Sequence, residues 1–147
     1  MDWLIMINKL LYQVIVYFSS EFTNIYKNKI NMELKNKLLM ILTKHNADLL
    51  SQYDGFMGYI LESEKKGNVS NPLYKWTKDS LKNKSKIEKY HNSYTIYVNA
   101  EEVYSKKVAD SLENHLTKIV DEKFIIRISK HDTNPANNPQ PPSKYYK

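Results

Sequence analysis

The chain has 147 residues, of which 41% are hydrophobic and 26% are charged, and these values are typical of one globular domain. It has no cysteine, which excludes disulfides, thiolate catalysis and cysteine metal sites and fits a cytoplasmic protein. The net charge of +6 suits a polyanionic partner. Because Arg127 is the only arginine, base-specific reading of the DNA major groove is disfavoured. Nonspecific contact with phosphates is still open to the lysines.

Apolar residues from Leu4 to Phe18 recur at three- and four-residue spacing, and this pattern predicts a helix over residues 3–28. Residues 3–18 are too few to span a membrane. Because nearly every side of this helix would be apolar, we expect it to be buried, to form a subunit contact or to lie on a membrane surface. Residues 10–18 are also rich in Val, Ile, Tyr and Phe, which favours a strand as the alternative.

A second helix is predicted to begin after Asn31, which is a suitable N-cap, and to carry an apolar stripe from Leu34 to Tyr53. Gly55 and Gly58 then interrupt the pattern. We expect a bend or a break there, or a close approach of another backbone, followed by a polar turn over residues 62–71.

The pair Asn71-Pro72 has the composition of a helix start, with Asn as the cap and Pro at the first helical position. The apolar residues that follow predict a helix reaching Ile87. Five lysines of this segment recur at three- and four-residue spacing, so one helical face would carry all of them.

The C-terminal half predicts a strand, a helix and a second strand. Residues 94–98 are β-branched and aromatic. Asn99 and Glu102 have the spacing of a capping box, so a helix is expected over residues 100–122 and a strand over 124–129. A helix of this length permits a right-handed parallel crossover. Because two strands make a poor sheet, an N-terminal segment or a second chain must supply more.

Residues 131–147 lack apolar periodicity and are rich in proline, which predicts a disordered or polyproline-II tail. Pro139, Pro142 and Lys144 match a P-x-x-P-x-K pattern, which is typical of peptides that dock on aromatic grooves.

Together these patterns predict an α+β fold in which N-terminal helices pack on a small sheet that contains the C-terminal β-α-β unit. Residues 1–130 would form one domain, mainly helical over 1–91 and β-α-β over 92–130, followed by the tail at 131–147.

Three functions are considered. Composition favours a non-enzymatic adaptor, regulatory or assembly protein that contacts a protein partner or itself. The alternative is a protein that binds single-stranded nucleic acid through lysines and aromatic rings; its candidate residues are Lys75, Lys78, Lys82, Lys86, Lys89, Trp76 and Tyr90.

A third hypothesis is a small nuclease-like enzyme in which His91 acts as general base beside lysines. Three glycines in 147 residues disfavour a small-molecule enzyme, because phosphate-binding and nucleophile turns use glycine. The four histidines are isolated in sequence, so no catalytic set, metal site or cofactor is expected.

Overall fold

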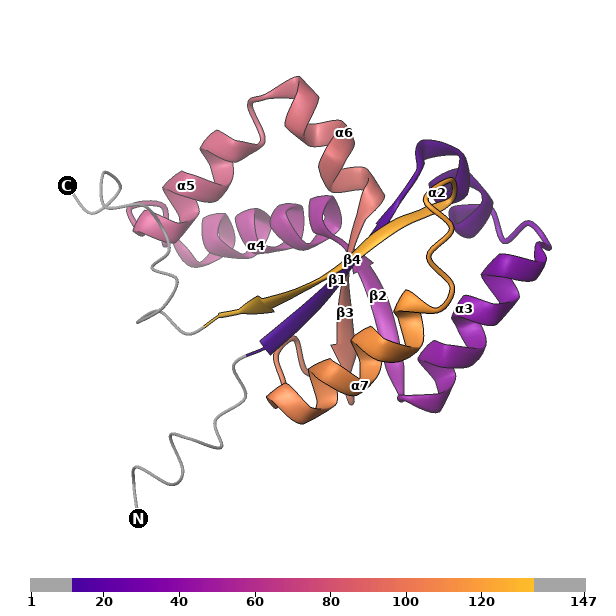
Figure 1. Ribbon diagram of the computed structural model, residues 1–147. Coiled ribbons are helices and arrows are strands. Elements are labelled where there is room, and N and C mark those ends of the chain that lie inside the picture. Colours follow the sequence, from indigo (N-terminus) through magenta and orange to yellow (C-terminus); the bar gives the residue numbers. More distant parts are fainter. Residues whose placement is uncertain (1–11, 134–147) are drawn as a thin grey trace, which may run out of the picture.

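The computed structural model describes residues 12–133, which form a four-stranded sheet with helices on both sides (Figure 1). The strands are β1 (Tyr12–Phe18), β2 (Ala47–Ser51), β3 (Ser93–Val98) and β4 (Ile125–Asp132). The helices are α2 (Ser20–Lys27), α3 (Glu33–Lys44), α4 (Gln52–Lys66), α5 (Pro72–Ser80), α6 (Lys84–Asn92) and α7 (Lys106–Thr117). The predicted α+β class is confirmed.

The strand order is β2-β3-β1-β4, and each neighbouring pair is antiparallel. β3 and β4 are therefore parallel to each other, but β1 lies between them, so the predicted crossover does not join neighbouring strands. β1 and β2 are likewise parallel and are separated by β3. Two such split β-α-β units give the ferredoxin-like order of elements. Here the connection from β2 to β3 also carries α4, α5 and α6.

The predicted helix over residues 3–28 is wrong for residues 12–18, where the alternative strand is correct. Val14, Val16 and Phe18 point into the main core, and Ile15 is buried on the opposite face. A central strand that is apolar on both faces lacks the alternation that distinguishes a strand from a buried helix. Ser19 then caps α2, accepting a hydrogen bond from the Phe22 amide at 3.0 Å.

The second predicted helix is too long, because α3 ends at Lys44 and its last predicted turns form β2. Asn46 adopts a left-handed conformation (φ 51°) that reverses the chain. Ala47 and Leu49 then join the core from a strand. The predicted cap is also one residue off, since α3 begins after Met32 and no side chain caps it.

The predicted interruption at Gly55 and Gly58 is wrong. α4 passes through both glycines and continues to Lys66, so the predicted polar turn begins later. Among residues 12–133, a Cβ at Gly55 would meet only the Leu50 side chain, and one at Gly58 would meet nothing within 4 Å. The helix ends at Gly67, whose positive φ of 76° suits glycine.

The Asn71-Pro72 start is confirmed, because the Asn71 side chain accepts a hydrogen bond from the Leu73 amide at 2.8 Å. The predicted extension to Ile87 is wrong, since α5 ends at Ser80. Asn83 caps a separate helix, α6. Of the five lysines of the predicted single face, two consequently lie on α5, Lys82 lies in the turn and two lie on α6.

The strand at 94–98 is confirmed as β3, but the predicted helix at 100–122 begins later. Asn99 and Ala100 have φ values of 52° and 64° and form a tight turn instead of a helix start. Ser105 caps α7. β4 extends through Asp132, so the first two residues assigned to the tail belong to the sheet. Residues 134–147 lie outside the described part.

The main core lies between the sheet and the helices α2, α3 and α7. Its fully buried side chains include Phe22, Leu38, Ile96, Leu112 and Leu116. Within residues 12–133, α4, α5 and α6 contribute no side chain to this core. They lie on the opposite side of the sheet (Figure 1), near Leu50 of β2. None of the described helices is both long and apolar enough to cross a membrane.

Candidate functional site

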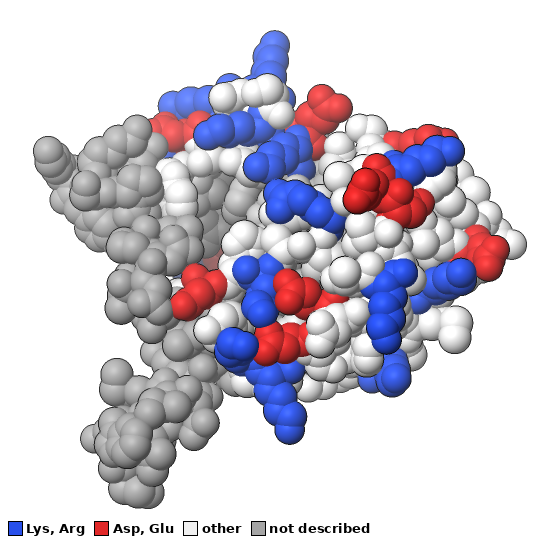
Figure 2. Space-filling view, viewed as in Figure 1, with Lys and Arg blue, Asp and Glu red and all other residues white. Residues whose placement is uncertain are grey.

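The most basic part of the described surface is formed by α5, α6 and the turn between them. Residues 72–92 contain six lysines and two acidic residues. Figure 2 shows lysine side chains gathered over these two helices at the top of the molecule, with few acidic side chains among them. We call this set the α5–α6 lysine surface; it comprises Lys75, Lys78, Lys82, Lys84, Lys86 and Lys89.

Two of these lysines are held by carboxylates. Lys78 Nζ lies 2.9 Å from Glu64, and Lys82 Nζ lies 3.3 Å from Asp79. The hydrogen bond to Glu64 raises the pKa of Lys78 above its usual range. The remaining members of the surface are exposed and form no ion pair within residues 12–133. Their positive charge is therefore available to an external anion.

The aromatic residues predicted beside the lysines are placed differently from one another. Trp76 is half-buried. Tyr90 packs edge-on against Phe56, with ring centroids 4.9 Å apart, and His91 stacks on Tyr53 at 4.0 Å. Tyr90 and His91 thus hold α6 against α4. Of the two aromatic residues predicted to bind, Trp76 has no aromatic partner within the described residues, whereas the ring of Tyr90 is already packed.

A second group of polar side chains lies on the sheet, on the side that also carries α4–α6. Tyr17 of β1 and Arg127, Ser129 and His131 of β4 form it, and we call it the β4 polar cluster. The guanidinium of Arg127 lies 3.7 Å from the centre of the Tyr17 ring. Ser129 Oγ is 3.2 Å from Tyr17 Oη and 2.7 Å from His131 Nε2.

The electrostatics of this cluster favour a neutral imidazole. Burial lowers the pKa of His131 below its usual value, and the nearby Arg127 lowers it further. The positive charge of the cluster is therefore concentrated on the guanidinium. Arg127 is exposed, and no carboxylate within residues 12–133 pairs with it.

Sequence reasoning missed the β4 polar cluster. Arg127, Ser129 and His131 alternate along one strand, and this spacing places them on one face. The signal was therefore present, but the predicted strand ended at residue 129. Tyr17 could not be linked to them without the pairing of β1 with β4, which sets Tyr17 opposite Arg127.

A pair of histidines joins α3 to α7 on the other side of the sheet. His45 Nε2 lies 2.7 Å from His115 Nδ1. Burial lowers the pKa of His45, and the charges of His115 and Lys44 lower it further. Within the described residues no group of three or more His, Asp or Glu side chains is placed to hold a metal ion.

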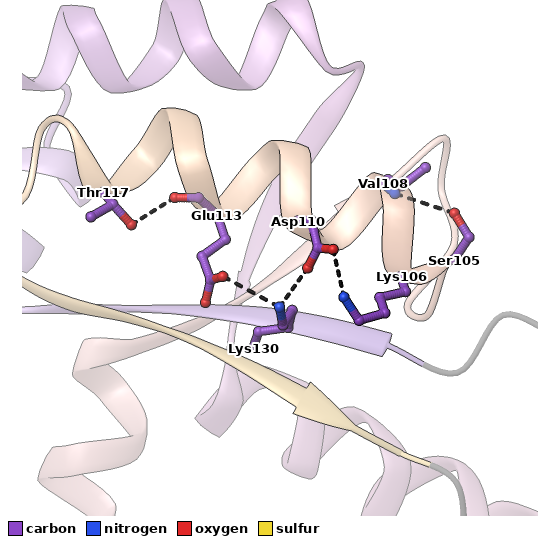
Figure 3. Close-up of polar contacts among 7 residues, drawn as sticks. All are labelled: Ser105, Lys106, Val108, Asp110, Glu113, Thr117 and Lys130. Carbon is purple, nitrogen blue, oxygen red and sulfur yellow. Dashed lines mark hydrogen bonds and ion pairs between the residues drawn. The ribbon is translucent and has the colours of Figure 1, made fainter.

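Lys130 of β4 reaches from the sheet to α7, where it contacts the carboxylates of Asp110 and Glu113 (Figure 3). Asp110 also accepts a hydrogen bond from Lys106 at 2.8 Å. The side chain of Lys130 is only 24% exposed. This network balances its charges internally and fastens the last strand to its helix, so we interpret it as structural.

The docking residues predicted in the tail, Pro139, Pro142 and Lys144, lie outside the described residues, and their role stays a prediction. No family model, no curated protein and no solved structure matches this chain.

Proposed function

We propose that this protein binds nucleic acid or a similar polyanion through the α5–α6 lysine surface. The observation that supports this proposal most strongly is the placement of the lysines. They are concentrated on helices inserted between two strands that pair with each other, and those helices add nothing to the main core. The lysines therefore lie on the layer that covers the second face of the sheet, and not on the elements that form the main core.

The exposure of four of these lysines supports the same function. Lys75, Lys84, Lys86 and Lys89 are exposed and without an ion pair in the described region. Lysine contacts phosphates as a point charge and reads bases poorly. With Tyr90 packed against Phe56, base stacking has at most Trp76 to use. We therefore expect binding that is driven by phosphates and is weakly dependent on sequence.

The test is fluorescence anisotropy of a labelled single-stranded DNA and of the matching duplex, measured from low to physiological salt. The test variant replaces Lys75, Lys84, Lys86 and Lys89 by Gln. The matched control carries the same loss of charge on other exposed positions, with Lys27, Lys44, Lys107 and Lys118 replaced by Gln.

We expect the test variant to bind at least about tenfold more weakly than the control. For the single strand, its log-log salt slope should fall by about 3, because each lost phosphate contact contributes about 0.7. Equal loss in both variants would mean that only net charge matters, and no binding by the unaltered protein at low salt would refute the proposal.

The adaptor or assembly function that composition favours stays a prediction. One of its supports, a helix through residues 12–18 that could form a subunit contact, is removed because these residues form a central strand.

A further inference from the structure

We infer that the β4 polar cluster is a discrete binding site for a phosphate monoester. This goes beyond the proposed polyanion binding, which uses lysines on different elements and requires no defined anion position. The inference rests on the geometry of Tyr17, Arg127, Ser129 and His131.

The guanidinium of Arg127 is oriented before any ligand arrives. It stacks on the Tyr17 ring at 3.7 Å, and such stacking fixes the plane of the five N–H donors. No carboxylate in the described part of the chain uses these donors. An exposed, oriented and unpaired guanidinium is suited to bidentate binding of an oxyanion.

The hydroxyl groups add a second donor. Ser129 donates its single proton to Tyr17 Oη at 3.2 Å. His131 Nε2 lies 2.7 Å from Ser129 Oγ, and the tautomer of His131 sets the direction of this chain of hydrogen bonds. In the tautomer with the proton on Nε2, His131 donates to Ser129, Ser129 donates to Tyr17, and the proton of the Tyr17 hydroxyl has no acceptor among the described residues. It is free to bind a ligand oxygen beside the guanidinium.

This donor set indicates phosphate over carboxylate. A carboxylate has two oxygens in one plane, and the planar fork of Arg127 alone would engage both. A phosphate monoester has three terminal oxygens in a tetrahedral arrangement, so two can meet the guanidinium while the third accepts the Tyr17 proton. Its double negative charge also matches a site that lacks acidic residues among its members.

The experiment compares thymidine 5′-phosphate, inorganic phosphate and thymidine by NMR titration of the full chain, following the amides of β1 and β4. We expect thymidine 5′-phosphate to bind at least about tenfold more tightly than thymidine, the effect of one or two charge-assisted hydrogen bonds. Inorganic phosphate that competes for the same amides supports the inference and shows that the anion itself is recognised. Equal affinity for the nucleotide and the nucleoside overturns it.

Variants distinguish the contributions of the Arg127 guanidinium and the Tyr17 hydroxyl to binding. Arg127→Gln should reduce the preference for the phosphorylated ligand to less than about twofold. Tyr17→Phe retains the ring under the guanidinium and removes only the hydroxyl, so it should cause an intermediate loss in a chain that still folds. The fourfold lysine variant is the control and should leave the preference unchanged. If Arg127→Gln retains the full preference while its melting curve is normal, the site is not the one inferred.

Discussion

At the residue scale, Tyr104 closes the end of the β1–β3 ladder. Its hydroxyl accepts a hydrogen bond from the Val14 amide and donates one to the Ile96 carbonyl, each at 2.9 Å. Its own amide and carbonyl pair with Tyr12. Burial raises the pKa of Tyr104 to about 12. One side chain thus satisfies two backbone groups that would otherwise be buried and unpaired.

We predict that Tyr104→Phe lowers the free energy of unfolding by about 1–3 kcal/mol, the cost of leaving buried polar groups without partners. Tyr94 provides the matched comparison. Its hydroxyl is buried and has no hydrogen-bond partner in the described part of the chain, so Tyr94→Phe should be neutral or stabilising. Urea denaturation of both variants measures the difference, and an equal loss would contradict this assignment.

At the scale of elements, two contacts attach α7 to its neighbours. The His45–His115 pair joins it to α3, and Lys130 joins it to β4. Both contacts depend on protonation, and both weaken as the pH falls. The deprotonated form is the stabilising one in each case. For His45 this is the neutral imidazole, and for Asp110, whose pKa is lowered most by Lys106 and also by Lys130, it is the ionised carboxylate.

The histidine pair predicts a loss of stability on mild acidification. The pKa of His45 is lower in the folded chain than its unfolded value of about 6.5, so the unfolded state binds more protons as the pH falls. The free energy of unfolding should therefore be highest above about pH 7 and decrease toward pH 5. His45→Gln should flatten this profile, though not abolish it, because His131 titrates in the same sense. His91→Gln leaves the pair intact and should retain the profile.

The ion-pair network of Lys130 predicts a loss of stability at a lower pH than the histidine pair does. Lys130→Met removes the cation between Asp110 and Glu113 and leaves two carboxylates close together, so we expect a lower melting temperature near pH 7. Lys66→Met, which removes an exposed pair with Glu62, should have little effect. The deficit of Lys130→Met should shrink below the usual aspartate pKa of about 4, as Asp110 is protonated. A deficit that is independent of pH would indicate lost packing instead of lost charge.

At the scale of the whole molecule, stability is expected to be unevenly distributed. The strands β1 and β3 are paired on both sides and contribute to the main core, while α5 and α6 contribute nothing to it. We predict that native-state hydrogen exchange is slowest in β1 and β3, and that α5 and α6 open with a smaller free energy. Equal protection throughout would show that the insertion unfolds only with the core. Added polyanion should protect α5 and α6 preferentially if the proposed function is correct.

The sequence by itself determined features that depend on neighbouring residues: the α+β class, the cap at Asn71, the strand at 94–98 and the concentration of lysines over residues 72–92. These follow from local backbone preferences and from side-chain composition. It did not determine β1, because a strand buried on both faces has the same apolar pattern as a buried helix. It did not determine β2, because Leu49 continues the apolar spacing of the preceding helix, and the strand order depends on pairing between distant segments. The tertiary structure decided which distant residues meet: Tyr17 with Arg127, and His45 with His115. Their contacts exist only because β1 pairs with β4 and α3 packs beside α7, and these arrangements are set by burial of the whole core.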